Sequence, residues 1–349
     1  MNPYILSTFL MALGLGTTIT FASSNWLLAW IGLEVNTLAI LPLMARHHHP
    51  RSVEASTKYF LAQATAAATL LFASTSNAWL TGHWTICNTS HPLPTALLVL
   101  ALCLKLGLAP THTWLPEVLQ GIDLRTGLIL STWQKLAPFS LMLQVDSPSA
   151  SAPLLVMAVL SILVGGWAGL NQTQLRKLLA YSSVAHLGWI VLVMQFSPGL
   201  SLLALALYMI MTFPLFLSFE LNNATSINQL ALSWAKTPSL TALTPLLLLS
   251  LGGLPPLTGF MPKWLILAEL TKQGLVTIAT LVALSALLSL YFYLRLSYAV
   301  ALTIPPNNTP GTSAWRLSLV HVPLPLSLSA ATALTLLPLT PGVSAVLVS

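Results

Sequence analysis

Long runs of apolar residues, interrupted at short intervals by proline, glycine and polar residues, are the main pattern of this chain. Most runs are close to the roughly 20 residues that an α-helix needs to cross a lipid bilayer. The positions of the interruptions predict eleven membrane-spanning helices. These helices are expected at about residues 3–21, 25–45, 55–80, 93–120, 124–145, 151–170, 175–195, 199–221, 239–271, 275–303 and 323–345.

Composition supports this pattern and excludes other classes of protein. Of the 349 residues, 56% are hydrophobic and 6% carry a formal charge. Soluble domains have roughly 25% charged residues, so a soluble globular fold and a disordered chain are both excluded. We therefore expect an all-α polytopic membrane protein. The start of the chain has no basic segment before its first apolar run, so no cleaved presequence is expected.

Charge and cysteine content exclude several kinds of site. The net charge of +6 does not indicate nucleic-acid binding, because the basic residues are scattered between apolar runs. Cys87 and Cys103 form no CxxC pair, so neither an iron–sulfur cluster nor a thiolate metal site is expected. The triplet His47, His48 and His49 looks like a metal-binding tract, but adjacent side chains do not converge on one ion as i, i+4 pairs do. No metal site is predicted.

Basic residues between the apolar runs predict the orientation of the chain. With an odd number of spans, the termini face opposite sides of the membrane. The connections on the side of the N-terminus hold eight basic residues, whereas the opposite connections hold only Lys272. By the positive-inside rule, the N-terminal side faces the compartment where the protein is made. The eight residues are Arg46, Arg51, Lys58, Arg125, Arg176, Lys177, Lys236 and Arg316.

An internal repeat relates the two halves of the sequence. The segment GLAPTHTWLPE, which starts at Gly107, matches GLPPLTGFMPK, which starts at Gly253, at a constant offset of 146 residues. This offset divides the chain into five-helix units at residues 1–146 and 147–304, followed by a last helix within 305–349. Two prolines recur in each segment, and they predict that one helix in each unit is broken. Breaks at matched places indicate an ion path, although kinks used only for packing are the alternative.

Four charged residues fall inside the predicted spans, away from their ends. They are Glu34, Lys105, Lys135 and Lys263. A charge at the bilayer centre costs roughly 2.5 to 3.5 kcal/mol on insertion scales, so each needs a partner or a hydrated cavity. We expect an ion pair between Glu34 and Lys105. Buried lysines change protonation state near neutral pH, so the four residues predict a proton relay; lysines that only satisfy broken backbone are the alternative.

Other polar residues carry weaker signals. His112 in the first break and His186 in the seventh span are candidate relay members, although a lone histidine in an apolar helix more often serves packing. Arg295 lies near the basic side, where anchoring at the membrane surface is the better account. The group Glu117, Asp123 and Arg125 is interpreted as a solvated loop rather than a proton entrance. Most of the 11 tryptophans fit anchoring at the membrane interface.

The quoted residues give the chain a resemblance to a known family. Glu34 in WIGLEVN, Lys105 before the broken GLAPTHTWLPEVLQG, Lys135, and Lys263 in LGGLPPLTGFMPKW resemble the antiporter-like membrane subunits of respiratory complex I. The resemblance implies two five-helix repeats, each with one discontinuous helix, and proton transfer through a glutamate–lysine pair, a central lysine and a further lysine. The longer relatives in this family have three helices before the first repeat. This chain lacks those three helices, and the short vertebrate members of the family lack them too.

The resemblance also implies a cellular setting. It places the chain in the mitochondrial inner membrane, with the N-terminus on the matrix side and the C-terminus on the intermembrane-space side. The expected partners are other membrane-arm subunits of the complex, together with phospholipids. Flavin, iron–sulfur clusters and ubiquinone are expected to bind in other subunits, and no cofactor is expected here.

Three hypotheses about function follow. The main one is a membrane-arm subunit of the proton-pumping NADH:ubiquinone oxidoreductase that relays protons through the buried residues. The second is an independent cation/proton antiporter whose broken helices bind Na⁺ or K⁺. The third is a structural spacer whose buried charges only lock helices together.

Overall fold

The computed structural model describes residues 2–46, 49–87, 89, 91–145, 148–235, 237–303, 324–339, 341, 342 and 345. Within these ranges the regular structure is helical, and the only β-type pairings are two isolated bridges, Asn25–Thr85 and Gln174–Ser226. Four residues named above, His47, His48, Lys236 and Arg316, lie outside the described ranges.

The helices follow one another with short connections. In chain order they are α1 (Pro3–Ala22), α2 (Trp26–Met44), α3 (Pro50–Thr81), α4 (Pro92–Leu106), α5 (Trp114–Gly121), α6 (Leu124–Ser131), α7 (Trp133–Gln144), α8 (Pro148–Gly169), α9 (Leu175–Met194), α10 (Pro198–Leu221), α11 (Ile227–Leu232), η1 (Ser233–Ala235), α12 (Pro238–Gly252), α13 (Phe260–Lys272), α14 (Val276–Leu302), α15 (Leu324–Thr335) and η3 (Leu337–Leu339).

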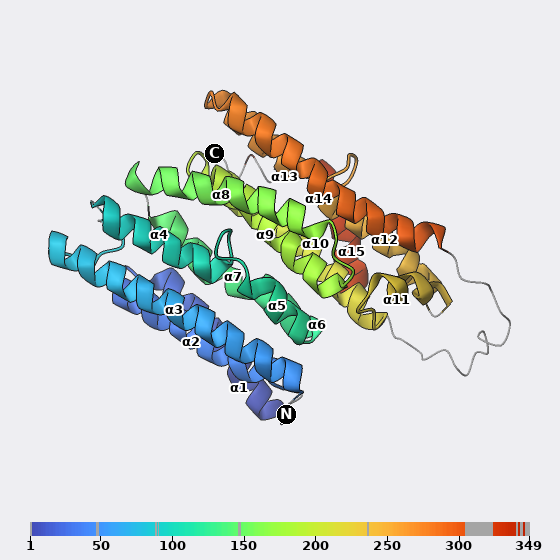
Figure 1. Ribbon diagram of the computed structural model, residues 1–349, viewed down its shortest axis with the longest axis horizontal. Helices are drawn as coiled ribbons and strands as arrows, with labels where there is room; N and C mark the ends of the chain where they lie inside the picture. Colours follow the sequence, from blue (N-terminus) through green and yellow to red (C-terminus); the bar gives the residue numbers. More distant parts are fainter. Residues whose placement is uncertain are drawn as a thin grey trace. The chain divides into compact units, whose positions relative to one another are not determined.

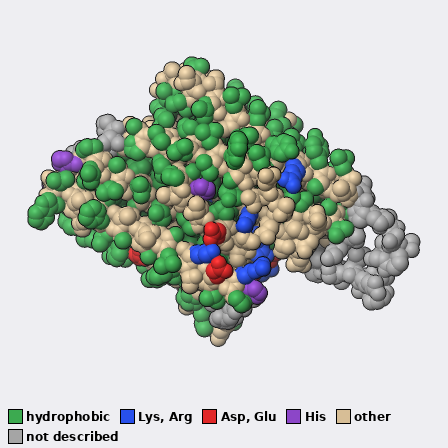
Figure 2. All heavy atoms as spheres, viewed as in Figure 1, with side chains coloured by type: hydrophobic (Ala, Val, Ile, Leu, Met, Phe, Trp, Pro, Cys, Tyr) green, Lys and Arg blue, Asp and Glu red, His purple; other side chains and the backbone are tan. Residues whose placement is uncertain are grey.

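Six helices of the described chain are long and apolar enough to cross a membrane: α1, α2, α8, α9, α10 and α14. The apolar helices α4, α12 and α15 are shorter. The predicted spans at 93–120 and 239–271 are each two helices, as expected from their prolines. The span predicted at 124–145 is also divided, into α6 and α7, and the sequence analysis did not predict this division. On the face shown in Figure 2, charged side chains are few, as in a membrane protein.

The chain forms two compact units, Met1–Ser161 and Ile162–Ser349, and their division falls inside α8. In the first unit α1, α2, α3 and α4 pack on one another in chain order, and α7 packs against α1, α2 and α4 (Figure 1). In the second unit α10 is central, because it packs against α9, α12, α13 and α15, while α14 packs against α12 and α13.

Glycine ends the first half of each broken helix. Gly107 after α4 has φ 79° and Gly253 after α12 has φ 78°, a left-handed conformation that only glycine adopts without strain. The N–H of Gly107 donates to Cys103 and Leu104, and the N–H of Leu108 donates to Cys103 at 2.9 Å. Gly253 and Leu254 repeat this pattern at the end of α12. Both ends therefore satisfy their last carbonyls within the turn.

The four prolines of these segments lie at positions where proline is compatible with a break, but they do not by themselves end the helices. Pro110 and Pro256 lie in the connecting loops, where no helical hydrogen bond is lost. Pro116 and Pro262 lie in the first turns of α5 and α13, where helices tolerate proline. The predicted breaks are thus present, and their starting points are set by glycine.

Candidate functional site: a polar cavity beside two buried lysines

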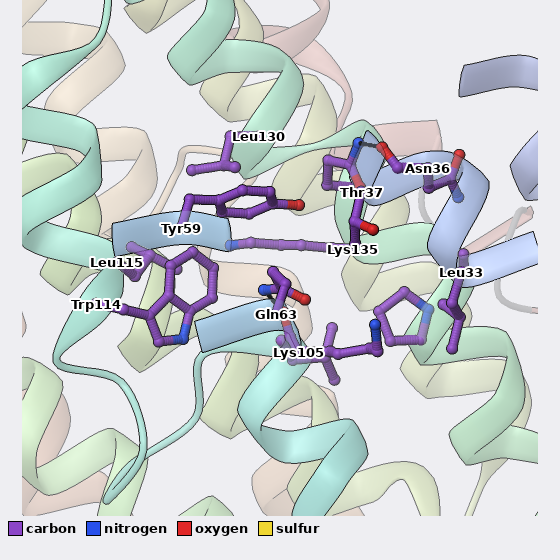
Figure 3. A pocket seen from close by; sticks show the side chains of 14 residues that line it. Leu33, Asn36, Thr37, Tyr59, Gln63, Lys105, Trp114, Leu115, Leu130 and Lys135 are labelled. Carbon is purple, nitrogen blue, oxygen red and sulfur yellow. Dashed lines mark hydrogen bonds between the residues drawn. The ribbon is translucent and has the colours of Figure 1, made fainter. Parts of the chain in front are cut away.

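Lys105 and Lys135 line one cavity in the first unit. Its volume is about 20 Å³, which is enough room for a water molecule. Lys105 is 6% exposed and Lys135 is 3% exposed, so both amines lie in the interior of the unit. Figure 3 shows the Lys135 side chain extended between Tyr59 and Gln63 in that view. The other polar or aromatic lining residues are Asn36, Thr37, Tyr59, Gln63, Trp114 and Gln134.

Breaks in the helices position both lysines. Lys105 lies in the last turn of α4, directly before the Gly107 turn, where a cation is favoured by the carbonyl end of the helix dipole. Lys135 lies in the first turn of α7, after Thr132, whose φ of −115° and ψ of −72° separate α7 from α6. The N–H of Lys135 still donates to the carbonyl of Thr132, at 3.3 Å. The two lysines therefore line the same cavity from the ends of two different helices.

The amine of Lys105 has no hydrogen-bond partner among the described residues. Nearby donors are directed to the backbone instead: Gln63 Nε2 donates to the carbonyl of Lys105 at 3.5 Å, and Trp114 Nε1 donates to that of Leu104 at 3.1 Å. Buried polar groups in proteins nearly always have a partner, either protein or ordered water. A cavity of this size beside an unpaired ammonium group is therefore suited to hold water.

Glu34 does not form the ion pair that the sequence analysis predicted. Within the described chain, no Glu34–Lys105 contact meets the 4.0 Å limit for an ion pair. Instead Glu34 Oε2 accepts a hydrogen bond of 3.1 Å from Thr37, one turn further along α2. The half-buried carboxylate thus already has a local donor on its own helix.

Two aromatic or amide residues of α3 complete the site, and the sequence analysis missed them. Tyr59 is 2% exposed, and its ring lies edge-on to Trp114 with 5.7 Å between centroids. Gln63 is 4% exposed and lies one turn after Tyr59. Their i, i+4 spacing places both on one face of α3. This polar face within an otherwise apolar run was the signal that would have identified them.

Lys263 in the second unit uses its amine differently. It lies in the first turn of α13, and Nζ donates to the carbonyl of Gly252 at 2.8 Å, at the end of α12. Its side chain also crosses the Gly253 turn, because a Cβ added at Gly253 would meet Lys263 Cδ at 3.0 Å. Lys263 therefore joins the two halves of the second broken helix. This contact is the one that the alternative interpretation of these lysines predicted.

His186 belongs to a separate polar cluster in the second unit. Its Nε2 lies 3.4 Å from the hydroxyl of Tyr293, and its ring lies against Tyr208 with 5.5 Å between centroids. Both tyrosines are almost fully buried. Sequence reasoning did not single out these tyrosines. The cluster provides groups that can donate and accept protons within apolar helices.

The remaining candidates lie nearer the surface or outside the cavity. His112 is half-buried in the loop between α4 and α5 and is not among the cavity-lining residues of the described structure. Glu117 is exposed and pairs with Lys58 at 2.7 Å; Lys58 also pairs with Glu54 at 2.7 Å. Asp123 and Arg125 are exposed. In the described ranges, no group of three or more His, Cys, Asp and Glu side chains is arranged to hold a metal ion.

Two family profiles cover most of the chain. Residues 23–289 match the family described as NADH:quinone oxidoreductase/Mrp antiporter, TM, and residues 290–344 match NADH dehydrogenase subunit 2 C-terminus. Among solved structures, a chain of respiratory complex I from Thermus thermophilus with bound aureothin is 29% identical with a TM-score of 0.83, over 98% of this chain and 79% of that chain. A chain of the Mrp complex from Dietzia sp. DQ12-45-1b, at 19% identity and a TM-score of 0.78 over 97% and 79%, shares the fold.

Relatives from fish are similar over nearly their whole length. The protein named NADH-ubiquinone oxidoreductase chain 2 of Tetraodon nigroviridis is 67% identical over 98% of both chains. The protein of the same name from Oncorhynchus mykiss is 65% identical over 99% of both chains. Such identity over the full length leaves no large segment unmatched. The chain belongs to the family of NADH-ubiquinone oxidoreductase chain 2 proteins, within the antiporter-like membrane subunits of complex I.

Proposed function

We propose that this chain is a membrane-arm subunit of respiratory complex I, the proton-translocating NADH:ubiquinone oxidoreductase, and that it relays protons while other subunits carry out the redox reaction. The observation that carries this proposal is the cavity shared by Lys105 and Lys135. The cavity has room for water beside an ammonium group that has no hydrogen-bond partner in the described chain. A lysine that only satisfied broken backbone would be expected to have such a partner.

The relay acts through the field of each charge on its neighbours. When Lys105 gains a proton, its attraction to Glu34 strengthens and the proton on nearby Lys135 becomes easier to release. At an effective dielectric constant of about 20, two unit charges 4 Å apart interact by roughly 4 kcal/mol. Glu34 and Lys105 lie farther apart than this, and an interaction of about half that size still shifts a protonation equilibrium more than tenfold. Glu34, Lys105 and Lys135 form the relay of the first unit.

The second unit supplies its own proton-carrying groups. Lys263 at the broken helix and His186 in its tyrosine cluster are the relay residues there. The imidazole can take a proton on one ring nitrogen and release one from the other, and the phenol of Tyr293 lies at its Nε2. His112 in the first break has the same chemistry and is the further relay candidate of the first unit.

The full architecture under this proposal is eleven transmembrane helices, in two five-helix repeats at 1–146 and 147–304 and a last helix within 305–349. Matched details of the two units support the repeat. The glycine turns after α4 and α12 share their hydrogen-bond pattern. An isolated bridge at the start of α2, Asn25–Thr85, corresponds to Gln174–Ser226 at the start of α9.

The proposed setting is the mitochondrial inner membrane, crossed several times, within a hetero-oligomeric complex with other membrane-arm subunits and phospholipids. The N-terminus faces the matrix and the C-terminus faces the intermembrane space, as the eight basic residues on one side predict. Flavin, iron–sulfur clusters and ubiquinone bind to other subunits, so the enzymatic activity of this chain is that of the whole complex.

The test is the proton-to-electron ratio of complex I, purified and reconstituted in liposomes, with Lys135→Met or Glu34→Gln in this chain. Under the proposal both variants assemble and pump fewer protons per NADH oxidised. The exposed Lys272→Met variant is the matched control, and its ratio stays at the wild-type value. An unchanged ratio in both buried variants would contradict the relay. Poor assembly with normal pumping in the assembled fraction would favour the structural-spacer hypothesis, and cation-dependent proton flux by the chain alone would favour the antiporter.

A further inference from the structure

Helix α14 exposes an apolar stripe that contains one cation. Leu284, Leu287, Tyr291 and Tyr298 are 67%, 58%, 59% and 58% exposed and follow one another at helical spacing. Arg295 is exposed in the same stripe, one turn after Tyr291. Because α14 is apolar and long enough to cross a membrane, this stripe faces the surroundings of the subunit within the bilayer. An arginine in such a stripe needs an anionic or polar neighbour.

The end of α8 holds the guanidinium of Arg295 in place. Arg295 Nη1 donates to the carbonyl of Leu170 at 2.8 Å, directly after the last residue of α8. Glycines allow the two helices to approach this closely: a Cβ at Gly169 would lie 2.8 Å from the ring of Phe292, and one at Gly166 would lie 3.1 Å from Leu288. The guanidinium is therefore fixed at the level where α8 ends, and because α8 is long and apolar enough to cross a membrane, that end is expected in the headgroup region.

The guanidinium keeps donors available at that level. It has five N–H donors in a planar fork, and in the described chain the one hydrogen bond that it makes goes to Leu170. Such a fork matches the two free oxygens of a phosphodiester. Trp167, three residues before Leu170, is 72% exposed, and Tyr298 follows Arg295 by one turn. Exposed tryptophan and tyrosine are typical of the membrane interface, where a lipid headgroup meets its acyl chains.

We propose that Arg295 binds the phosphate of an acidic phospholipid, whose acyl chains lie along the exposed stripe of α14. The charge of the guanidinium selects an acidic headgroup, and the leucines of the stripe select acyl chains. A carboxylate from a neighbouring subunit would supply a negative charge for Arg295. It has no acyl chains, however, and would leave the apolar stripe of α14 uncovered. This inference depends on α14 crossing the membrane and not on the relay of protons.

The test compares complex I purified with wild-type chain, Arg295→Gln, Arg295→Lys and the control Lys272→Gln. Lys272 is an exposed lysine of the same unit that already pairs with Glu269 at 3.6 Å. Mass spectrometry counts the acidic phospholipids retained per complex, and electron cryo-microscopy locates headgroup density. The expected result is phosphate density on the wild-type guanidinium and loss of a single acidic lipid in Arg295→Gln, with retention in the control and partial retention in Arg295→Lys.

Two results would overturn the proposal. One is a neighbouring subunit's carboxylate, rather than a phosphate, seated on Arg295 in the wild-type complex. The other is an unchanged lipid count in Arg295→Gln. If Arg295→Gln fails to assemble, the wild-type density alone decides between phosphate and carboxylate. Proton pumping is measured in parallel, and it is expected to be unaffected in the assembled Arg295→Lys complex.

Discussion

Replacing Lys105 with methionine separates a proton-relay role from a structural role. Methionine has nearly the length of lysine without the charge, so the cavity wall keeps its shape. Two opposing terms set the effect on stability. Removing a buried ammonium group saves roughly 2.5 to 3.5 kcal/mol of insertion cost. The attraction to Glu34 is lost, and this is less than about 4 kcal/mol, because the two groups lie farther apart than 4.0 Å.

Because these terms oppose each other, the loss of stability is expected not to exceed about 2 kcal/mol. The Lys105→Met complex should therefore assemble to near wild-type amounts on a native gel. Its NADH-driven proton pumping in liposomes should nevertheless fall, since the cavity has lost one of the two lysine amines that are proposed to carry protons. Lys272→Met is the control for loss of a surface lysine. Full pumping by an assembled Lys105→Met complex would refute this reasoning, and failure to assemble would show that the amine is structural.

Three further substitutions test other parts of the account. Gly107→Ala should lower the melting temperature of the complex, because alanine is strained at φ 79° by about 1 kcal/mol and its Cβ would meet Leu115 at 2.8 Å. The control Gly82→Ala, with φ 76° and nothing within 4 Å of the added Cβ, should show only the backbone strain. Equal drops in melting temperature for the two variants would contradict this. Lys263→Met should destabilise the complex more than Lys105→Met does, since it removes a 2.8 Å hydrogen bond to the Gly252 carbonyl at the end of α12. The loss of that hydrogen bond costs about 1–3 kcal/mol. A thermal melt showing the reverse order would be inconsistent with the structure. Tyr293→Phe should slow pumping without affecting assembly, because it removes the hydroxyl 3.4 Å from the histidine of the second unit; unaltered pumping would remove that cluster from the relay.

The helical fold and its breaks could be predicted from the sequence because they depend on local chemistry. Uninterrupted apolar runs gave the long helices, and the repeated Gly–Leu–x–Pro segments gave the breaks after Leu106 and Gly252. The division at Thr132 could not be predicted, because neither proline nor glycine marks it and it depends on how α6 and α7 pack. The eleven-helix count and the repeat boundaries stay predictions.

The candidate site could be predicted only in part. The buried lysines stood out as rare charges, and two of them share a cavity. The direct Glu34–Lys105 pair was wrong, because sequence cannot tell that Thr37 satisfies the carboxylate and that the two helices hold the charges apart. Tyr59 was missed because an aromatic residue in an apolar run is typical of packing, and the one sequence signal for a polar face was Gln63 at i+4 spacing. Proximity between distant helices is set by tertiary packing, which no single helix pattern contains.

Under the proposed relay, water joins Lys105 to Lys135 within the first unit. A high-resolution structure of the intact complex in a lipid environment tests it most directly, through the density in the cavity of about 20 Å³. We expect an ordered water molecule that accepts a hydrogen bond from Lys105 Nζ and links it toward Lys135. A dry cavity, or one closed by a protein group bonded directly to Lys105, would contradict it.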